Sequence, residues 1–441
     1  MRTNVLFSLL LVGLFSWAGA QGQGFGVDDC VRYALNNRPS LRNARLLDSI
    51  AELNNAISLA AWKPFVTLGG GLTNNIKQQV SIFPSFMNPG ELQEVTIGTA
   101  WTSNATATAT QLIYSPLVAR DARLQAPLLE RARLDIETRE IAVRAAVERA
   151  FHNSLRRLEE VEIVEANIQR LDRALRDARL FYEEGITDKV DYKRATIARN
   201  RARQDLTAAE LALGTALATL KREMGYPESL PLELDYTYAD YVDLILADSL
   251  IRLDPRERVE VRALLVDRGV QDLFLLGARR AWLPEVSASA QYGFFWQANA
   301  FGSLYDRSFP AAFAALNVNV PLFSGWRRFR QVELETVRQR QIDYDLQNIR
   351  DQISLEFTSA ENAYRTARRG FIIARENTAL AREVYDVVLL QYREGIEPFL
   401  EVVIAENDLQ TSRINALNAL IDAMLARTDL EVAAGTLNDE Q

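Results

Sequence analysis

The chain reverses direction at Tyr392-Arg-Glu-Gly395-Ile396, within a stretch from Gln341 to Leu437 that decides the fold. Before this turn, apolar or small residues recur at alternating steps of four and three, which is the heptad spacing of packed helices. A second, mainly aromatic row repeats every seven residues beside the first. The first row is Ile342, Leu346, Ile349, Ile353, Ala360, Ala363 and Ala367, and the second is Phe357, Tyr364, Phe371, Tyr385 and Tyr392.

No proline occurs between Pro321 and Pro398, so nothing in this interval forces the helix to end. A helix from about Trp326 to Arg393 would be roughly 100 Å long. The combined stripe is wider than a two-helix seam requires, so we expect this helix to contact more than one neighbour. A long antiparallel coiled coil with no other role fits this stretch equally well.

Composition places the chain among folded proteins that lack membrane-spanning helices. It has 441 residues, of which 48% are hydrophobic and 24% charged. Residues 1–20 contain Arg2, an apolar run and a small-residue cleavage site before Gln21, which predicts a secretory signal peptide. The net charge of −8 argues against a nucleic-acid partner.

Reactive residues are too few for catalysis. Cys30 and His152 are the only cysteine and histidine, and no glycine-rich phosphate loop is present. An enzyme would need a positioned base, nucleophile or metal, so we predict that the chain is not an enzyme and holds no cofactor or metal. We expect Cys30 to be a small buried residue on the first helix and His152 to be an exposed or half-buried structural residue.

The first part of the chain contains a helix, a β segment and a long helix. A helix is predicted from Asp28 to Trp62, with Asp28 or Asp29 as its N-cap and an interruption at Pro39. Residues 74–95 contain Asn, Pro and Gly and predict a long loop. A second long helix is predicted over about 118–183.

The same order of elements then recurs. Tyr182-x-Glu184-Gly185-Ile186 matches the turn at Tyr392, and Ala61-Trp62-Lys63-Pro64 resembles Ala281-Trp282-Leu283-Pro284. These and other landmarks recur about 210 to 220 residues apart, so a tandem repeat is predicted. The first copy covers residues 21–231, with a β-hairpin at 64–115 and a tip at 182–188. The second covers 232–441, with a β-hairpin at 284–324 and a tip at 392–398.

The strands alternate apolar and polar residues over about ten positions, which is typical of transmembrane β-strands. In the first hairpin Ala105, Ala107 and Ala109 alternate with threonines. A small soluble β-layer packed on helices is the alternative. Four strands cannot close a barrel, and unpaired strand edges are too costly in hydrocarbon, so a membrane-spanning sheet must be completed by other copies of the chain.

With its duplicated tips, the Trp-x-Pro entry to each hairpin and Leu322-Phe323-Ser324-Gly325 after the last strand, the chain resembles the TolC family of outer-membrane efflux and secretion ducts. The resemblance covers nearly the whole mature sequence. It implies a mainly α homotrimer in which four β-strands per protomer form a shared 12-strand outer-membrane barrel in a Gram-negative bacterium, contacting outer-membrane lipid. The tandem-duplicated long helical hairpins would continue the barrel as a periplasmic α-barrel. A periplasmic adaptor and an inner-membrane pump would be the partners, with no nucleic acid involved. An adaptor or structural coiled-coil protein without a pore is the alternative, which the alternating strands disfavour.

The resemblance also implies site residues. The adaptor would dock on the tips, at Tyr182, Gly185, Ile186, Tyr392, Gly395 and Ile396. These residues fit equally well as ends of the hairpins with no other role. A pore constriction of inward-facing acids would use Asp386, with Glu383 on the same helix. Leu389 stands where a second acid of that ring would be expected, and ordinary solvated acids are the alternative.

Overall fold

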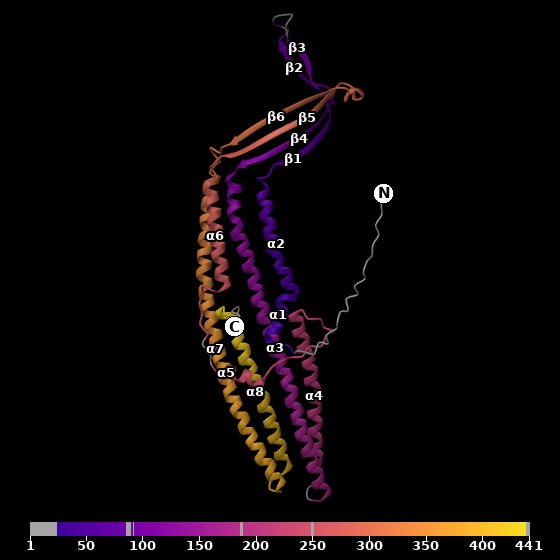
Figure 1. The fold of residues 1–441 in the computed structure, drawn as a ribbon, viewed down its shortest axis with the longest axis vertical. Coiled ribbons are helices and arrows are strands. Elements are labelled where there is room, and N and C mark those ends of the chain that lie inside the picture. The colour runs from indigo at the N-terminus through magenta and orange to yellow at the C-terminus, as the bar shows by residue number, and fades with distance from the viewer. Residues whose placement is uncertain (1–23, 85–89, 91, 186–187, 248–250, 438–441) are drawn as a thin grey trace, which may run out of the picture. The chain divides into compact units, whose positions relative to one another are not determined.

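The computed structural model describes residues 24–84, 90, 92–185, 188–247 and 251–437. The helices and strands (Figure 1) divide between two compact units. Unit 1 contains the described parts of residues 1–43, 138–255 and 352–441, and unit 2 those of 44–137 and 256–351. Each unit combines segments of both predicted repeats, so the division of the chain at residues 231 and 232 stays a prediction.

The elements confirm the predicted long helices. Helix α3 has 68 residues and α7 has 67, and both contribute residues to the two units. The helices are α1 (Val27–Asn37), α2 (Pro39–Ala60), α3 (Pro116–Glu183), α4 (Lys189–Met224), α5 (Tyr238–Leu246), α6 (Val259–Arg280), α7 (Arg327–Arg393) and α8 (Phe399–Ala434), with a short 3-10 helix, η1 (Phe301–Ser303). The strands are β1 (Phe65–Asn74), β2 (Gln79–Pro84), β3 (Leu92–Ile97), β4 (Trp101–Tyr114), β5 (Glu285–Ala298) and β6 (Ser308–Asn319).

The start of the chain follows the sequence pattern except at its cap. Pro39 opens α2 and separates it from α1, as predicted. The predicted N-cap at Asp28 or Asp29 is wrong, because Gly26 is the N-cap. The Gly26 N–H donates to the Asp29 carboxylate at 3.3 Å. Both aspartates lie in the first turn, where a negative charge is favourable near the positive end of the helix dipole.

Unit 1 is a helical unit held together by several buried clusters. One cluster brings α1, α3 and α4 together around Phe151, with Cys30 fully buried as predicted. Another packs α5, α7 and α8 around Tyr364 and Phe371, which belong to the aromatic row found in the sequence. Arg368 of α7 donates to the carbonyls of the last two α5 residues at 2.8 and 2.9 Å, which satisfies acceptors that a helix C-terminus leaves open.

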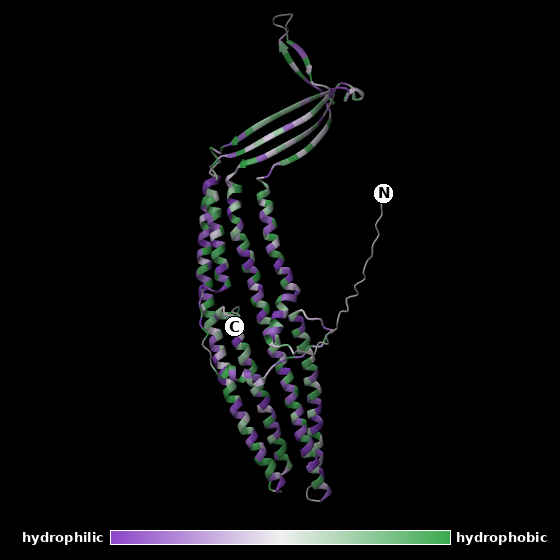
Figure 2. Cartoon of the chain, viewed as in Figure 1, coloured by the Kyte–Doolittle hydropathy of each residue, from purple (hydrophilic) through white to green (hydrophobic). Residues whose placement is uncertain are grey.

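Unit 2 is built on a four-stranded antiparallel sheet in the order β1-β4-β5-β6. One row across all four strands contains Val66, Ala109, Ala290 and Ala314, and the adjacent row is polar on its two central strands. Side chains alternate between the two faces of a strand, so the register gives the sheet one apolar and one more polar face. Figure 2 shows this alternation as changes of colour along the strands.

The edges of this sheet are unpaired. Among the described residues, β1 pairs only with β4, and β6 pairs only with β5. Each outer strand therefore presents backbone N–H and C=O groups that have no partner strand within the chain. Such edges are templates for pairing with another chain.

The predicted long loop over residues 74–95 is wrong at 79–84 and 92–95, which are strands, and residues 85–89 and 91 of that prediction lie outside the described residues. Strand β2 pairs with β3 in a separate two-stranded sheet, with Val80 opposite Thr96 and Ile82 opposite Glu94. Pro84 is the last residue of β2 and so does not interrupt the ladder. Pro84 thus belongs to a paired strand rather than to a loop.

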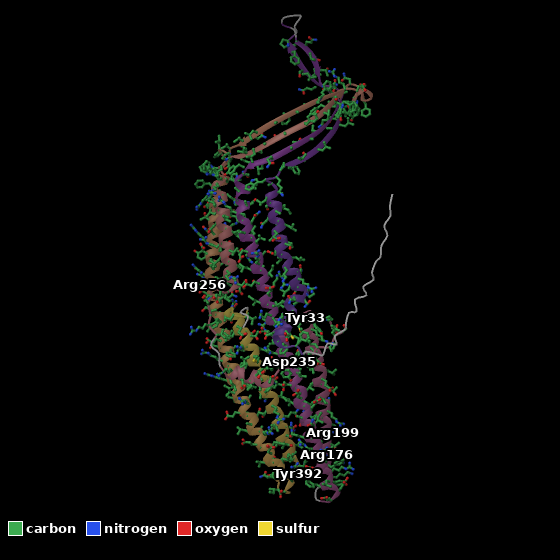
Figure 3. The ribbon with its side chains drawn as sticks, viewed as in Figure 1. Tyr33, Arg176, Arg199, Asp235, Arg256 and Tyr392 are labelled. Atoms are coloured by element: carbon green, nitrogen blue, oxygen red, sulfur yellow. The ribbon has the colours of Figure 1, made fainter. Side chains whose placement is uncertain are left out.

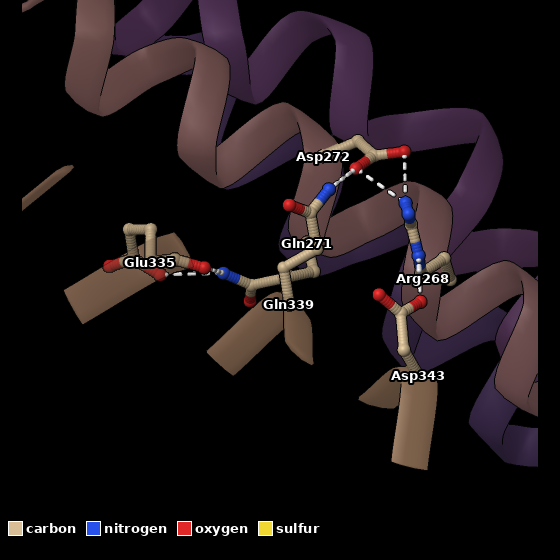
Figure 4. A network of polar contacts seen from close by, with 6 residues as sticks. All are labelled: Arg268, Gln271, Asp272, Glu335, Gln339 and Asp343. Carbon is tan, nitrogen blue, oxygen red and sulfur yellow. Dashed lines mark hydrogen bonds and ion pairs between the residues drawn. The ribbon is translucent and has the colours of Figure 1, made fainter. Parts of the chain in front are cut away.

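Polar side chains join α6 to α7 within unit 2 (Figure 4). Arg268 donates to Asp343 at 2.6 Å and to Asp272 one helical turn away at 2.7 Å. Gln271 donates to the Glu335 carboxylate at 2.8 Å, and both side chains are buried. These contacts fix the rotation of α7 as it leaves the sheet.

His152 is buried, which corrects the expectation of an exposed or half-buried residue. It is 3% exposed and lies edge-on to Phe151 and Tyr241. Burial lowers the pKa of His152 to about 4. The sequence could not show this burial, because α5, which supplies Tyr241, lies far along the chain from α3.

We predict that His152 makes folding sensitive to acid. Its folded pKa lies below the ordinary value of 6.5, so its stabilising contribution is complete above pH 6.5 and is lost as pH falls toward 4. Unfolding free energy should therefore fall by about 2 kcal/mol between pH 7 and 5 because of this residue. The measurement is the pH dependence of unfolding for the wild type and for His152→Gln.

The comparison must be made between these two proteins, because Glu148 acts in the opposite direction. Burial raises the pKa of Glu148 to about 7, so its protonation favours the folded chain as pH falls. A His152→Gln variant with the same pH slope as the wild type would contradict the assignment.

Candidate functional site

The α7–α8 turn is closed by a left-handed glycine. Gly395 has φ of 77°, and its N–H donates to the Tyr392 carbonyl at 3.0 Å. The Ile396 N–H donates to the Gln391 carbonyl at 2.9 Å, so two carbonyls at the end of α7 are satisfied. Pro398 then lies at the N-cap of α8. These local bonds explain why the chain reverses within so few residues.

The α3–α4 turn uses the same local chemistry. Gly185 has φ of 74°, and its N–H donates to the Tyr182 carbonyl at 3.1 Å. Helix α4 begins after its N-cap, Asp188. Ile186, which is one of the predicted docking residues, lies outside the described residues. A Cβ added to Gly185 or Gly395 would meet no atom within 4 Å, so backbone conformation rather than space favours glycine at both positions.

The two turns lie near each other in unit 1, over a shared apolar core. The Tyr392 ring lies 5.7 Å from Phe181 of α3 and 5.4 Å from Phe399 of α8, measured between ring centroids. Ala174 and Ala178 of α3 belong to the same cluster. Tyr392 is labelled beside the α7–α8 turn in Figure 3.

The two tip tyrosines therefore have different surroundings. Tyr392 is 4% exposed, and burial raises its pKa to about 12. Tyr182 is 39% exposed and stacks on Tyr192 of α4, with ring centroids 6.5 Å apart. Ile396 is 69% exposed. Among the predicted docking side chains that are described, Tyr182 and Ile396 are thus available at the surface, whereas Tyr392 supports the turn from within.

A buried ion pair lies behind the tips, and sequence reasoning missed it. Arg170 of α3 donates to Glu406 of α8 at 2.7 Å, and Glu406 is almost fully buried. Burial raises the pKa of Glu406, while the hydrogen bond from Arg170 opposes that shift. The available signal was a charged residue beside Asn407 and Gln410 in an otherwise apolar helix stripe. Removing one partner of such a pair leaves a buried charge unpaired, which is strongly destabilising.

The two predicted pore acids lie on the exposed surface of α7. The side chains of Glu383 and Asp386 are both exposed in the isolated chain. Burial lowers the pKa of Arg413 of α8, and the Asp386 carboxylate is one of the charges that oppose this shift. The structure therefore brings Asp386 near a basic residue and places neither acid in the buried core.

Helix α7 carries a further row at heptad spacing, outside the two rows found in the sequence, which we call the exposed seam. Each of its members precedes by one residue a buried or half-buried residue of α7, so the two rows lie about 100° apart around the helix. The covered row is Ala367, Phe371, Ala374, Thr378, Ala381, Tyr385 and Val388. Every member is exposed, although Ile373, Leu380, Val384 and Val387 are large and apolar. The exposed seam consists of Thr366, Gly370, Ile373, Asn377, Leu380, Val384 and Val387.

Within the described residues, no group of three or more His, Cys, Asp or Glu side chains is arranged to hold a metal ion. None of the described helices combines the length and the apolar character needed to cross a membrane.

Comparison with known proteins identifies the family. The profile of the outer membrane efflux protein family matches residues 31–226 and 277–436. Over 285 residues the chain is 24% identical to outer membrane efflux protein BepC of Brucella suis biovar 1 (strain 1330), and the match covers 63% of this chain. It spans only 59% of the length of BepC.

Solved structures show the same fold. CusC superposes with a TM-score of 0.71 at 15% identity, covering 94% of this chain and 95% of CusC. The CmeC outer membrane channel of Campylobacter jejuni gives 0.68 at 14% identity, covering 100% and 96%. The MtrE outer membrane channel of Neisseria gonorrhoeae gives 0.67 at 16% identity, covering 93% and 89%. The chain belongs to the outer membrane efflux protein family.

Proposed function

We propose that three copies of this chain form the outer-membrane duct of a tripartite efflux or type I secretion system in a Gram-negative bacterium. The duct passively conducts substrates that an inner-membrane pump delivers through a periplasmic adaptor. Family membership makes the chain a transport protein rather than an enzyme. The observation that carries the proposal is the antiparallel four-stranded sheet whose two edges, β1 and β6, are unpaired in the described chain.

Strand directions support closure by identical copies. Each neighbouring pair in the order β1-β4-β5-β6 is antiparallel, so β1 and β6 run in opposite directions. The β6 edge of one copy therefore meets the β1 edge of the next in the same antiparallel arrangement. A ring of copies can then satisfy every edge, which a sheet in hydrocarbon requires.

The faces of the sheet suit a membrane and a lumen. Rows such as Val66, Ala109, Ala290 and Ala314 give one apolar face, which is suited to lipid. The other face contains Thr106, Thr108 and Gln291 near its centre, and it faces the interior in this proposal.

Apolar rows on two helices support assembly. The exposed seam of α7 has the spacing of a coiled-coil interface but no partner helix within the described chain. Helix α2 has a similar exposed row at Leu46, Ile50, Leu53 and Ile57. Helices from neighbouring copies would cover both rows. Glu383 and Asp386 belong to neither row of α7 and so remain available to line a channel.

We predict that Leu380→Glu prevents assembly. In a trimer this substitution would bury three carboxylates without a partner at the subunit contacts, and burying an unpaired charge is strongly destabilising. Trimer recovered in unheated detergent extracts should fall at least about tenfold, with helical content retained because Leu380 lies outside the chain's own core. Ala379→Glu adds the same charge at the neighbouring exposed position and should leave the trimer intact. Equal trimer yields for both variants would refute this role of the exposed seam.

Asp386 is proposed as the pore constriction, with Glu383 beside it. Three copies of one carboxylate near a narrow axis attract cations and repel anions. Asp386→Ala should raise resting conductance in planar bilayers severalfold and weaken cation selectivity. The matched control is Asp408→Ala, which removes an exposed acid from α8. Unchanged conductance in Asp386→Ala would eliminate it as the constriction.

The tips are proposed to dock the adaptor, with Ile396 and Tyr182 at the surface and Gly185 and Gly395 shaping the turns. Ile186 belongs to the same proposal, and Tyr392 contributes from within by holding the α7–α8 turn. Ile396→Glu should abolish efflux-dependent growth on a pump substrate while the trimer persists, because a charge replaces an exposed apolar contact. Ile396→Val keeps the apolar contact and should retain growth. Normal growth of the Ile396→Glu strain would rule out this contact.

A further inference from the structure

The segment that joins β6 to α7 carries an unusual group of exposed apolar side chains. Leu322, Phe323, Trp326 and Phe329 are 92%, 78%, 69% and 68% exposed. The Trp326 ring lies 6.5 Å from Phe323 and 6.3 Å from Phe329 between centroids, both in edge-on arrangements. These rings contact one another yet stay mostly uncovered. An apolar patch of this kind marks a binding surface for a protein or a membrane.

Trp326 holds this position at a conformational cost. Its φ is 66°, and among the described residues it is the only non-glycine residue with positive φ. Gly325 before it also has positive φ, at 58°. A bulky side chain in this region is disfavoured, whereas glycine adopts it freely. Such strain marks a position whose side chain has a use beyond the stability of the chain.

Two arginines follow directly at the start of α7. Arg327 and Arg328 are exposed, and their side chains make no ion pair or hydrogen bond within the described part of the chain. Arg330, by contrast, is bound to Glu333 at 2.7 Å. The first turn of α7 contains no acid, so two free cations lie at the positive end of the helix dipole. This arrangement is unfavourable without an anion.

A cavity of about 530 Å³ lies beside these arginines. Arg327, Arg328 and Arg120 all contribute to its lining. Its two acids already have partners, because Glu285 accepts from Ser115 at 3.4 Å and Glu335 accepts from Gln271 at 2.8 Å. Arg120 is bound to Asp121 at 2.6 Å, so the positive charge that the lining offers to a ligand comes from Arg327 and Arg328.

The patch continues the apolar face of the sheet. Leu316 and Val318 of β6 lie on the face that holds Ala314, and Val320 and Leu322 continue the same alternate positions along the chain. All four are exposed. The apolar surface thus ends at Trp326, where the arginines begin. Aromatic rings beside basic groups are characteristic of the boundary between the hydrocarbon and the headgroups of a membrane.

We propose that residues 322–328, with Phe329, form a phospholipid-binding anchor. Trp326 and its neighbouring rings enter the boundary of the hydrocarbon, and Arg327 and Arg328 bind the phosphate of a phospholipid headgroup. This inference rests on the proposed function, which places the helix-bearing end of the sheet on the periplasmic side of the outer membrane. The ligand proposed is a phospholipid of the periplasmic leaflet, because the apolar patch and the two arginines lie next to each other in this segment.

The charge test compares two double variants of the full chain. Arg327→Gln with Arg328→Gln removes the proposed phosphate ligands, and Arg340→Gln with Arg350→Gln removes two exposed, unpaired arginines farther along α7. Purified trimers are titrated with phosphatidylglycerol, and with a diacylglycerol that lacks the phosphate, by native mass spectrometry. Phosphatidylglycerol binding should weaken about tenfold or more in the first variant and less than about twofold in the second. Equal effects of the two variants, or no effect of the first, would overturn the anchor.

Trp326→Gly tests the aromatic part without risk to the backbone, because glycine favours the observed φ. Lipids brominated near the headgroup should quench a component of wild-type tryptophan fluorescence that is missing in this variant. Identical quenching in both proteins would overturn the insertion of Trp326. Inorganic phosphate at millimolar concentration should not displace bound phosphatidylglycerol, and displacement would reassign the site to a free anion.

One control separates this inference from the proposed function. If the wild-type protein fails to float with lipid vesicles and fails to form a trimer, the proposed function is wrong. If the wild type does both, but the variants bind phosphatidylglycerol as it does, only the anchor is wrong.

Discussion

Backbone groups at the sheet edges set the requirement that the rest of this protein must meet. Four strands pair in series and leave β1 and β6 each with an unpaired side in the described chain. In water such an edge can be solvated, but in hydrocarbon each unpaired N–H or C=O costs several kcal/mol. In the proposed function, copies of the chain close the sheet and so satisfy these groups.

Helix α7 meets a parallel requirement through side chains. One of its faces carries Tyr364, Phe371 and Tyr385 into the core of the chain, and the neighbouring face carries the exposed seam. Helices of the chain itself cover the first of these faces, and no helix of the described chain covers the exposed seam. The sheet thus lacks neighbouring strands at its edges, and α7 lacks a neighbouring helix over the exposed seam.

Polar and strained groups then mark where this framework meets other molecules. The tips end in left-handed glycines, so the turns are tight and leave Ile396 and Tyr182 outside. In the β6–α7 segment, by contrast, a tryptophan has a backbone conformation that suits glycine. Two arginines whose side chains have no partner in the described chain lie beside it. The first arrangement costs little, and the proposed phospholipid accounts for the cost of the second.

The long helices, their turns, the four strands and the family could be predicted from the sequence. Heptad spacing, strand alternation and glycines at helix ends are local signals. Strands β2 and β3 escaped prediction because pairing between strands, rather than local composition, decides whether residues near a proline form a strand. Three features became visible only in the tertiary structure. They are the different surroundings of Tyr392 and Tyr182, the burial of His152, and the ion pair between Arg170 and Glu406. These outcomes depend on which helix, distant in the sequence, covers a given face. The two tips repeat the same residues, so their sequence alone cannot show that their neighbours differ.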